Sequence, residues 1–180
     1  VTDGIERITN GGVVTVDGRE RRADVIVLAT GFKATEYLES IDVVGRDGRR
    51  LHDDWEEARV AHAYKGLTVS GYPNFFMMYG PNTNQGGNSI IIILEAQATY
   101  IMSALKTMRR DGAKAVDVRR DVMDAYNREL AEALDGTLWH DGCDSYFKNA
   151  AGKIATQLPQ TSRWYADQTK RFKMKEYERI

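Results

Sequence analysis

The sequence predicts an α/β protein built from a short β-meander, a strand–turn–helix unit and C-terminal helices. Two segments support this prediction, because each is an apolar run that ends abruptly in small or turn-forming residues. The first is Asp24–Phe32 and the second is Asn74–Asn84, and a helical pattern begins soon after the second. A short apolar run of this kind is typical of a strand that is buried on both faces.

The β-meander is predicted from three short apolar segments near the start of the chain. These segments are Ile5–Thr9, Val13–Val16 and Val25–Ala29. Asn10–Gly12 and Asp17–Gly18 separate the first strands, and glycine adopts the positive φ of a tight turn at little cost.

The middle of the chain is predicted to contain a connector followed by two further strands. Lys33–Lys65 has no sustained hydrophobic period, so we expect a connector with short elements. Gly66–Tyr72 and Phe75–Tyr79 are the strand candidates.

A long helix is predicted to begin after Asn88 or Ser89 and to run to about Arg110. Either side chain can cap the first turn, and an apolar stripe at helical spacing follows. A second helix is predicted at Asp121–Leu134, with Asp121 as its cap and Gly136 as its stop.

The C-terminal part is predicted to be a long loop and a short helix. Trp139–Pro159 has no clear period, and a loop longer than ~12–15 residues is usually functional or disordered. The last twenty residues are expected to be helical near Arg163–Lys170 and irregular after that.

Composition excludes several classes of protein. The net charge of −1 gives no indication of a nucleic-acid or acidic-membrane partner. Apolar stretches such as Ile90–Leu94 fall far short of the ~20 residues of a membrane span, so none is expected. Cys143 is the only cysteine, no metal-ligand spacing occurs, and the first ten residues lack a signal-peptide core. We therefore expect a cytoplasmic protein without a metal site.

The two strand ends are typical of a cofactor-binding α/β sheet, yet the phosphate-binding half is missing. No G-x-G-x-x-G or Walker loop occurs in the sequence. We therefore expect this chain to be a piece of a larger enzyme.

Several motifs resemble one family of enzymes. Ala29–Phe32 resembles the "ATG" linker strand of flavoproteins with two dinucleotide-binding domains. Gly80–Ile90, followed by Glu95–Gln97, resembles the C-terminal flavin segment of class B flavoprotein monooxygenases. Within these it is most similar to Baeyer–Villiger monooxygenases of the 4-hydroxyacetophenone monooxygenase type. The tail order Cys143–Tyr146, Gly152–Lys153 and Leu158–Pro159 also fits.

The resemblance implies that the chain is a C-terminal fragment of such a two-domain flavoprotein. Residues 1–32 would be the end of the NADPH-domain sheet with the linker strand, and residues 33–180 the C-terminal part of the FAD domain with its tail. The parent enzyme would use FAD, NADPH and O2 to convert a small-molecule ketone to an ester or lactone. The fragment would be inactive alone, because both Gly-rich fingerprints are missing.

Two alternatives remain open from the sequence. One is a related flavin monooxygenase that oxygenates nitrogen or sulfur, and the other is a non-catalytic binding domain. The fragment hypothesis predicts a large apolar face where the missing domains would dock, and therefore possible self-association.

The predicted flavin-edge residues are Asn82, Thr83, Asn84 and Gln85. They lie between a predicted buried strand and a helix N-terminus, where amides and the helix dipole favour negative charge. The resemblance implies that they face the pyrimidine edge of the flavin. The alternative is a turn whose side chains bond only the backbone around them.

The resemblance also implies two contacts with the nicotinamide cofactor. Thr30 and Gly31 would lie near the flavin–nicotinamide junction. Tyr146, Asn149 and Lys153 would lie in a loop that folds over NADPH, although the family usually has Trp where Tyr146 stands. The alternative is an inert surface loop. We assign no catalytic residue and no metal ligand to this chain.

Overall fold

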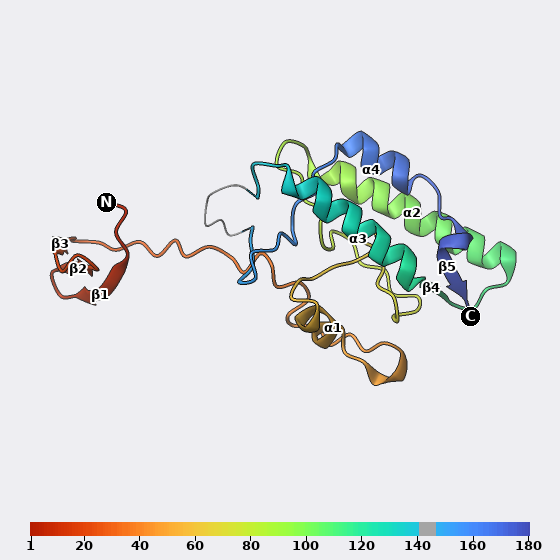
Figure 1. Cartoon of the computed structure of the whole chain (residues 1–180), viewed down its shortest axis with the longest axis horizontal. Helices are drawn as coiled ribbons and strands as arrows, with labels where there is room; N and C mark the ends of the chain where they lie inside the picture. Colours follow the sequence, from red (N-terminus) through yellow and green to blue (C-terminus); the bar gives the residue numbers. More distant parts are fainter. Residues whose placement is uncertain (141–146) are drawn as a thin grey trace. The chain divides into compact units, whose positions relative to one another are not determined.

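The computed structural model describes residues 1–140 and 147–180, which form two compact units. The first unit is Val1–Phe32 and the second is Lys33–Ile180 (Figure 1). This division falls at the domain boundary predicted from the sequence. The assignment of the two units to an NADPH domain and an FAD domain stays a prediction.

The first unit is a three-stranded antiparallel sheet with the strand order β1-β2-β3. Its strands are β1 (Ile5–Thr9), β2 (Gly12–Thr15) and β3 (Glu20–Arg22). The β1–β2 hairpin requires glycine at Gly12, which has a φ of 149°. A Cβ there would lie 2.0 Å from the carbonyl oxygen of Arg21.

The strand predicted at Val25–Ala29 is wrong, because this segment forms neither helix nor strand. Its apolar side chains are exposed: Val25 by 79%, Val27 by 82% and Leu28 by 76%. A strand needs a neighbour for its backbone hydrogen bonds, and no described strand pairs with this segment. The charged residues of β3 form the third strand instead.

The second unit contains four α-helices, two 3-10 turns and a two-stranded sheet among its described residues. They are Arg46–Gly48 (3-10), α1 (Leu51–Glu57), α2 (Ile90–Asp111), β4 (Val116–Val118), α3 (Arg120–Asp135), α4 (Ser162–Thr169), Met174–Glu176 (3-10) and β5 (Tyr177–Arg179). Strands β4 and β5 pair antiparallel. Helix α4 packs against α2 (Figure 1).

The three predicted helices are confirmed. Helix α2 begins after Ser89, whose Oγ accepts the amide of Ile91, and it ends at Gly112 in the left-handed region. Asp121 is not the cap of α3, because Arg119 occupies that position. Asp121 lies in the first turn of α3, where its carboxylate is favourable beside the helix amides.

The strands predicted at Gly66–Tyr72 and Phe75–Tyr79 are wrong. In the structure both segments form turns and irregular backbone, with only an isolated bridge between Tyr64 and Thr68. Leu67, Val69, Tyr72 and Met77 are nevertheless core residues, whereas Met78 and Tyr79 are exposed. Asn74, which lies between the two segments, has a positive φ angle. The short elements α1 and β5 were not predicted.

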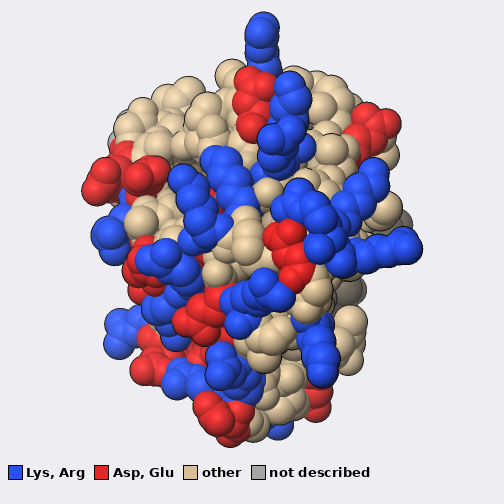
Figure 2. Space-filling model, turned by 90° about the vertical axis from the view of Figure 1, so that its right-hand side faces the viewer, with Lys and Arg blue, Asp and Glu red and all other residues tan. Residues whose placement is uncertain are grey.

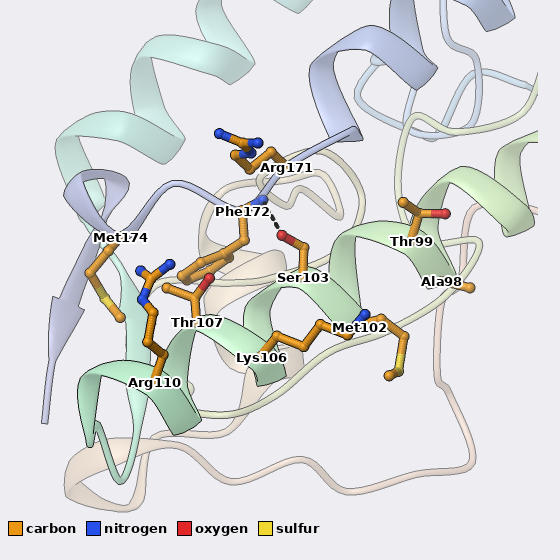
Figure 3. Close-up of a pocket in the computed structure, with 10 residues that line it drawn as sticks. All are labelled: Ala98, Thr99, Met102, Ser103, Lys106, Thr107, Arg110, Arg171, Phe172 and Met174. Atoms are coloured by element: carbon orange, nitrogen blue, oxygen red, sulfur yellow. Dashed lines mark hydrogen bonds between the residues drawn. The ribbon is translucent and has the colours of Figure 1, made fainter.

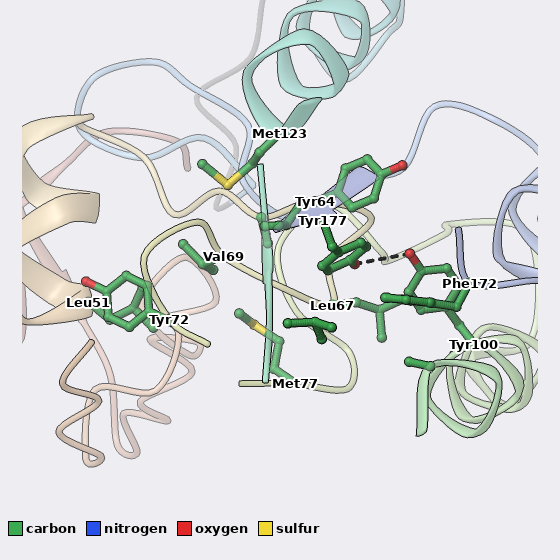
Figure 4. Packing of buried hydrophobic residues seen from close by; sticks show 14 of the residues in the cluster. Leu51, Tyr64, Leu67, Val69, Tyr72, Met77, Tyr100, Met123, Phe172 and Tyr177 are labelled. Atoms are coloured by element: carbon green, nitrogen blue, oxygen red, sulfur yellow. Dashed lines mark hydrogen bonds between the residues drawn. The ribbon is translucent and has the colours of Figure 1, made fainter. Parts of the chain in front are cut away.

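The main core includes residues of α2 and joins residues that are far apart in the sequence (Figure 4). The hydroxyl groups of Tyr100 and Tyr177 are 3.1 Å apart, and the rings of Phe172 and Tyr177 are 4.4 Å apart. Leu67, from the loop before the predicted site, is fully buried in the same cluster. The C-terminal segment is therefore packed into the core rather than left irregular.

Charged side chains of both signs are interspersed on the face drawn in Figure 2. Among the exposed ion pairs of the second unit, Arg119 pairs with Asp121, and Arg46 lies 3.5 Å from Glu178. Helix α2 is long and apolar enough to cross a membrane by length and composition alone, which is weak support for a span. The expectation of no membrane span therefore stays a prediction.

Candidate functional site

The segment 80–85 is held by a second segment that lies about 75 residues later in the chain. The amide of Asn82 donates to Ala155 O at 2.7 Å, and that of Asn84 donates to Thr156 O at 3.0 Å. The amide of Leu158 returns a bond to Asn84 O at 2.7 Å. These bonds give the turn a fixed backbone, which the sequence could not show because the partner is so distant.

Asn82 and Thr83 are buried and shape this turn from within. Asn82 has a φ of 55°, and its side-chain nitrogen Nδ2 donates to Ile154 O and Gln157 O at 3.0 Å each. The Thr83 hydroxyl donates to Gly80 O at 2.7 Å. Both side chains are therefore used inside the protein, as the backbone-bonding alternative proposed.

Asn84 and Gln85 are half-buried and lie nearer the surface of the turn. Asn84 Oδ1 accepts from the hydroxyl of Tyr79 at 3.0 Å. Gln85 Nε2 donates to Gln160 O at 2.6 Å, and Gln85 Oε1 accepts from Ser162 Oγ. Since Ser162 is the first residue of α4, these bonds fasten the start of α4 to the turn.

The residues between the turn and α2 are exposed, from Gly86 to Ser89. The described residues form no hydrogen bond to the amides of Gly86 and Gly87. A Cβ on Gly87 would meet nothing within 4 Å, so there is open space at this point. The N-terminus of a 22-residue helix beside such amides favours a ligand group that carries negative charge.

Unpaired polar atoms lie buried in the segment that holds the turn. Gln157 is fully buried, bridges to Asn84, and has no hydrogen-bond partner for either side-chain atom among the described residues. Buried polar groups of this kind are rare in native proteins and are usually completed by water or a ligand. The open helix start fits a ligand group that carries negative charge, and the unpaired atoms of Gln157 lie in the segment behind the turn.

Gly66 is a site residue that the sequence analysis missed. It has a φ of 63°, and a Cβ there would lie 2.1 Å from Thr83 Cγ2 and 2.8 Å from Pro81 O. A Cβ on Gly80 would lie 2.4 Å from Gly66 O. Two glycines therefore let the loop after Lys65 approach the turn closely.

The long loop after α3 contacts both the turn and α1. A Cβ on Gly86 would lie 2.8 Å from the ring of Trp139, so this ring lies against the backbone just after the turn. Lys153 Nζ donates to Ala58 O at 2.9 Å, and Asn149 Nδ2 donates to Arg59 O at 2.7 Å. Lys153 therefore holds the loop against the C-terminal end of α1, where a cation is favourable.

Tyr146 lies outside the described residues, so its predicted contact stays a prediction. Thr30 and Gly31 belong to the first unit, and both are exposed. Gly31 has a φ of 79° and open space where a Cβ would be. Their contact near the flavin–nicotinamide junction also stays a prediction.

A groove of about 920 Å³ lies on another part of the second unit, along the C-terminal half of α2 (Figure 3). Its lining includes Lys106, Arg110 and Arg171, with Phe172 at its base, and no carboxylate. None of the predicted site residues lines it, so it is separate from the candidate site. Among the described residues, no cluster of His, Cys, Asp or Glu could hold a metal ion.

Comparison with known proteins identifies similar sequences. No protein-family model matches the chain. A Baeyer–Villiger monooxygenase of Pseudomonas aeruginosa is 39% identical over 161 residues, which cover 88% of the chain and 30% of that protein. The chain thus spans about a third of the length of this relative.

Solved structures agree with the sequence match. The closed crystal structure of cyclohexanone monooxygenase has a TM-score of 0.77 at 27% identity, covering 99% of the chain and 34% of that protein. The crystal structure of OTEMO with FAD and NADP has a TM-score of 0.75 at 25% identity, covering 93% of the chain and 31% of OTEMO. The chain therefore belongs to the Baeyer–Villiger monooxygenase family of flavoproteins and corresponds to the C-terminal part of these proteins.

Proposed function

We propose that this chain supplies one wall of the flavin site in a longer, FAD- and NADPH-dependent Baeyer–Villiger monooxygenase that acts on a small-molecule ketone and O2. The observation that carries the proposal is the open start of α2 at Gly86–Ser89, set behind a turn whose backbone is fixed by residues 154–158. The names and bound cofactors of the similar proteins support it.

The residues of this chain bind and orient. The amides that precede α2 and the helix dipole stabilise negative charge at the pyrimidine edge of the flavin. Asn82 and Thr83 fix the turn, and Asn84 and Gln85 present its outer surface. FAD, when bound, supplies the chemistry of reduction by NADPH and of O2 activation.

The long loop has the separate role of excluding water. Trp139 contacts Gly86, and Lys153 and Asn149 fix the loop to the end of α1. A loop held over the turn in this way shields the reacting centre from solvent. In this arrangement Lys153 acts through the position of the loop, because its amine is bonded to Ala58 O.

The experiment compares the 180-residue chain with the same chain extended upstream by its nucleotide-binding segments. We expect flavin absorbance and ketone-dependent NADPH oxidation only in the extended protein, with an ester or lactone as product. Absence of bound flavin in the extended protein would refute the proposal. Products from an amine or sulfide, without any from a ketone, would replace it with the nitrogen- or sulfur-oxygenating alternative.

A matched pair of glycine variants locates the site. Gly87→Val fills the open space beside α2, and we expect it to weaken flavin binding in the extended protein at least tenfold. Gly136→Val also adds a side chain where nothing lies within 4 Å, but at the end of α3. It should bind flavin as the unaltered protein does. Equal flavin affinity in both variants would place the site elsewhere.

A further inference from the structure

A chain of buried hydrogen bonds runs from the turn to the C-terminal segment. Gln97 of α2 is fully buried, and its Oε1 accepts the amide of Tyr79 at 2.8 Å. Its Nε2 donates to the hydroxyl of Tyr165 at 2.9 Å. The Tyr165 hydroxyl in turn donates to Lys65 O at 2.6 Å. One phenol therefore joins α2, α4 and the loop that contains Lys65.

Lys65 extends this chain further into the C-terminal segment. Its side chain is only 3% exposed, and its Nζ donates to Gln168 O at 3.0 Å. The same nitrogen is 3.6 Å from Glu176 Oε2 and lies 4.6 Å from the centre of the Tyr64 ring. The ammonium group thus donates to the backbone of α4 and lies within ion-pair distance of the carboxylate that precedes β5.

Both ends of this network touch the proposed flavin-edge turn. Tyr79 bonds to Gln97 through its amide and to Asn84 through its hydroxyl. Gly66, the next residue after Lys65, is in close contact with Thr83. A change at Tyr165 would therefore reach the turn by two routes, one through Gln97 and one through Lys65.

We propose that Gln97, Tyr165 and Lys65 are positioning residues that couple the docking of α4 to the geometry of the flavin-edge turn. This inference deepens the proposed function and rests on it. The network touches no reacting atom and acts by fixing the amide of Tyr79 and the backbone next to Thr83. Buried polar networks of this kind specify one arrangement when they are fully satisfied.

The test compares two variants that each remove one buried phenol hydroxyl. Tyr165→Phe breaks the network, whereas Tyr177→Phe removes the hydroxyl that bonds Thr68 and Tyr100 and lies outside it. In the 180-residue chain we expect Tyr165→Phe to raise hydrogen exchange in residues 79–85 about tenfold. Tyr177→Phe should leave this exchange close to that of the unaltered chain, although both variants lower the melting temperature.

The second readout uses the extended protein with bound flavin. Tyr165→Phe should shift the flavin reduction potential and lower kcat more than it raises KM, and Tyr177→Phe should do neither. Equal effects of the two variants on exchange would overturn the coupling itself. Faster exchange in residues 79–85 without any change in flavin properties would refute the positioning role. If the extended protein binds no flavin, the proposed function and the positioning role fail together. The hydrogen-exchange result still decides whether α4 is coupled to the turn.

Discussion

The two apolar segments that look alike in the sequence differ in the structure in how far other residues bond to them and bury them. Asp24–Phe32 forms no regular structure, and its large side chains are exposed. Asn74–Asn84 is no strand either, yet it is fixed by bonds from residues 155–158 and by Gln97. We infer that an apolar run becomes ordered only where the chain supplies hydrogen-bond partners for its backbone. The order in the second segment therefore depends on a few contacts that can be broken one at a time.

The largest effect is expected from Gly66→Ala. The new methyl would overlap Thr83 Cγ2 and Pro81 O, and the left-handed backbone adds strain. We expect a loss of about 3 kcal/mol or more in the free energy of unfolding. Urea unfolding followed by circular dichroism measures it.

Gly48→Ala is the control, because Gly48 has a φ of 76° but nothing within 4 Å of a Cβ. It should lose only the strain of the backbone, about 1 kcal/mol. Equal losses in the two variants would mean that the close approach at the turn contributes nothing.

The next effect is the pH dependence that Lys65 imposes on the anchored segment. Burial lowers the pKa of Lys65 to about 8, a net value that includes the opposing effect of Glu176 and the smaller lowering by nearby Lys173. Because the folded pKa is below that of the unfolded chain, the unfolded state binds more protons between pH 8 and 10. Stability should therefore rise with pH in this range, by about 2 kcal/mol from pH 8 to 9.5.

The measurement is urea unfolding at several pH values from 7 to 9.5. Lys65→Met should lose the rise, and Lys170→Met, which changes an exposed lysine, should keep it. The range ends below pH 10, because burial raises the pKa of Tyr64 and Tyr100 in the folded chain. Near pH 10 these tyrosines would ionise first in the unfolded chain, which would oppose the rise in stability. Identical pH profiles for the unaltered chain and Lys65→Met would contradict the prediction.

How much of this contrast the sequence could predict depends on the distance between partners. Helix α2 was predictable, since Ser89 caps it and its apolar stripe is local in sequence. The bonds between Asn84 and residues 156–158 join positions more than 70 residues apart, so no local pattern indicates them. Gln97 did give a signal, because it is a polar residue at helical spacing between buried Ile93 and Tyr100.

The same local logic placed Asn82–Gln85 at a turn before a helix, whereas their role at the flavin edge was implied by the family resemblance and stays a prediction. The sequence placed Asn82 and Thr83 at the turn, but only the structure shows that both are buried and bonded inward. The strand at Val25–Ala29 failed for the converse reason. Its composition is that of a buried strand, and the described chain has no neighbour for it.

The exposed segment should affect association rather than stability. Val27→Lys places a charge on a side chain that is 82% exposed, so the free energy of unfolding should change by less than about 0.5 kcal/mol. Since exposed apolar patches promote association, we expect self-association to weaken about tenfold, which corresponds to about 1.4 kcal/mol. Sedimentation velocity over a range of concentrations measures it.

Leu138→Lys is the matched control, because Leu138 is 89% exposed but lies in the second unit, outside the run. It should associate as the unaltered chain does. Equal weakening by both substitutions would show that the run has no special role, and the contrast between the two segments would then be one of order only.

The smallest expected effect concerns the loop that precedes the residues holding the turn. Lys153→Met removes the bond to Ala58 O and leaves Asn149 as the remaining contact with the end of α1. Since an exposed charged hydrogen bond contributes little, we expect a loss of about 1 kcal/mol, confined to the loop. Hydrogen exchange in residues 147–153 should become about fivefold faster, while residues 80–85 exchange as before, because their bonds come from residues 155–158. Lys170→Met again provides the control without change in either region. Faster exchange in both regions of Lys153→Met would show instead that the loop and the turn open together, and the order of the second segment would then depend on the loop as well.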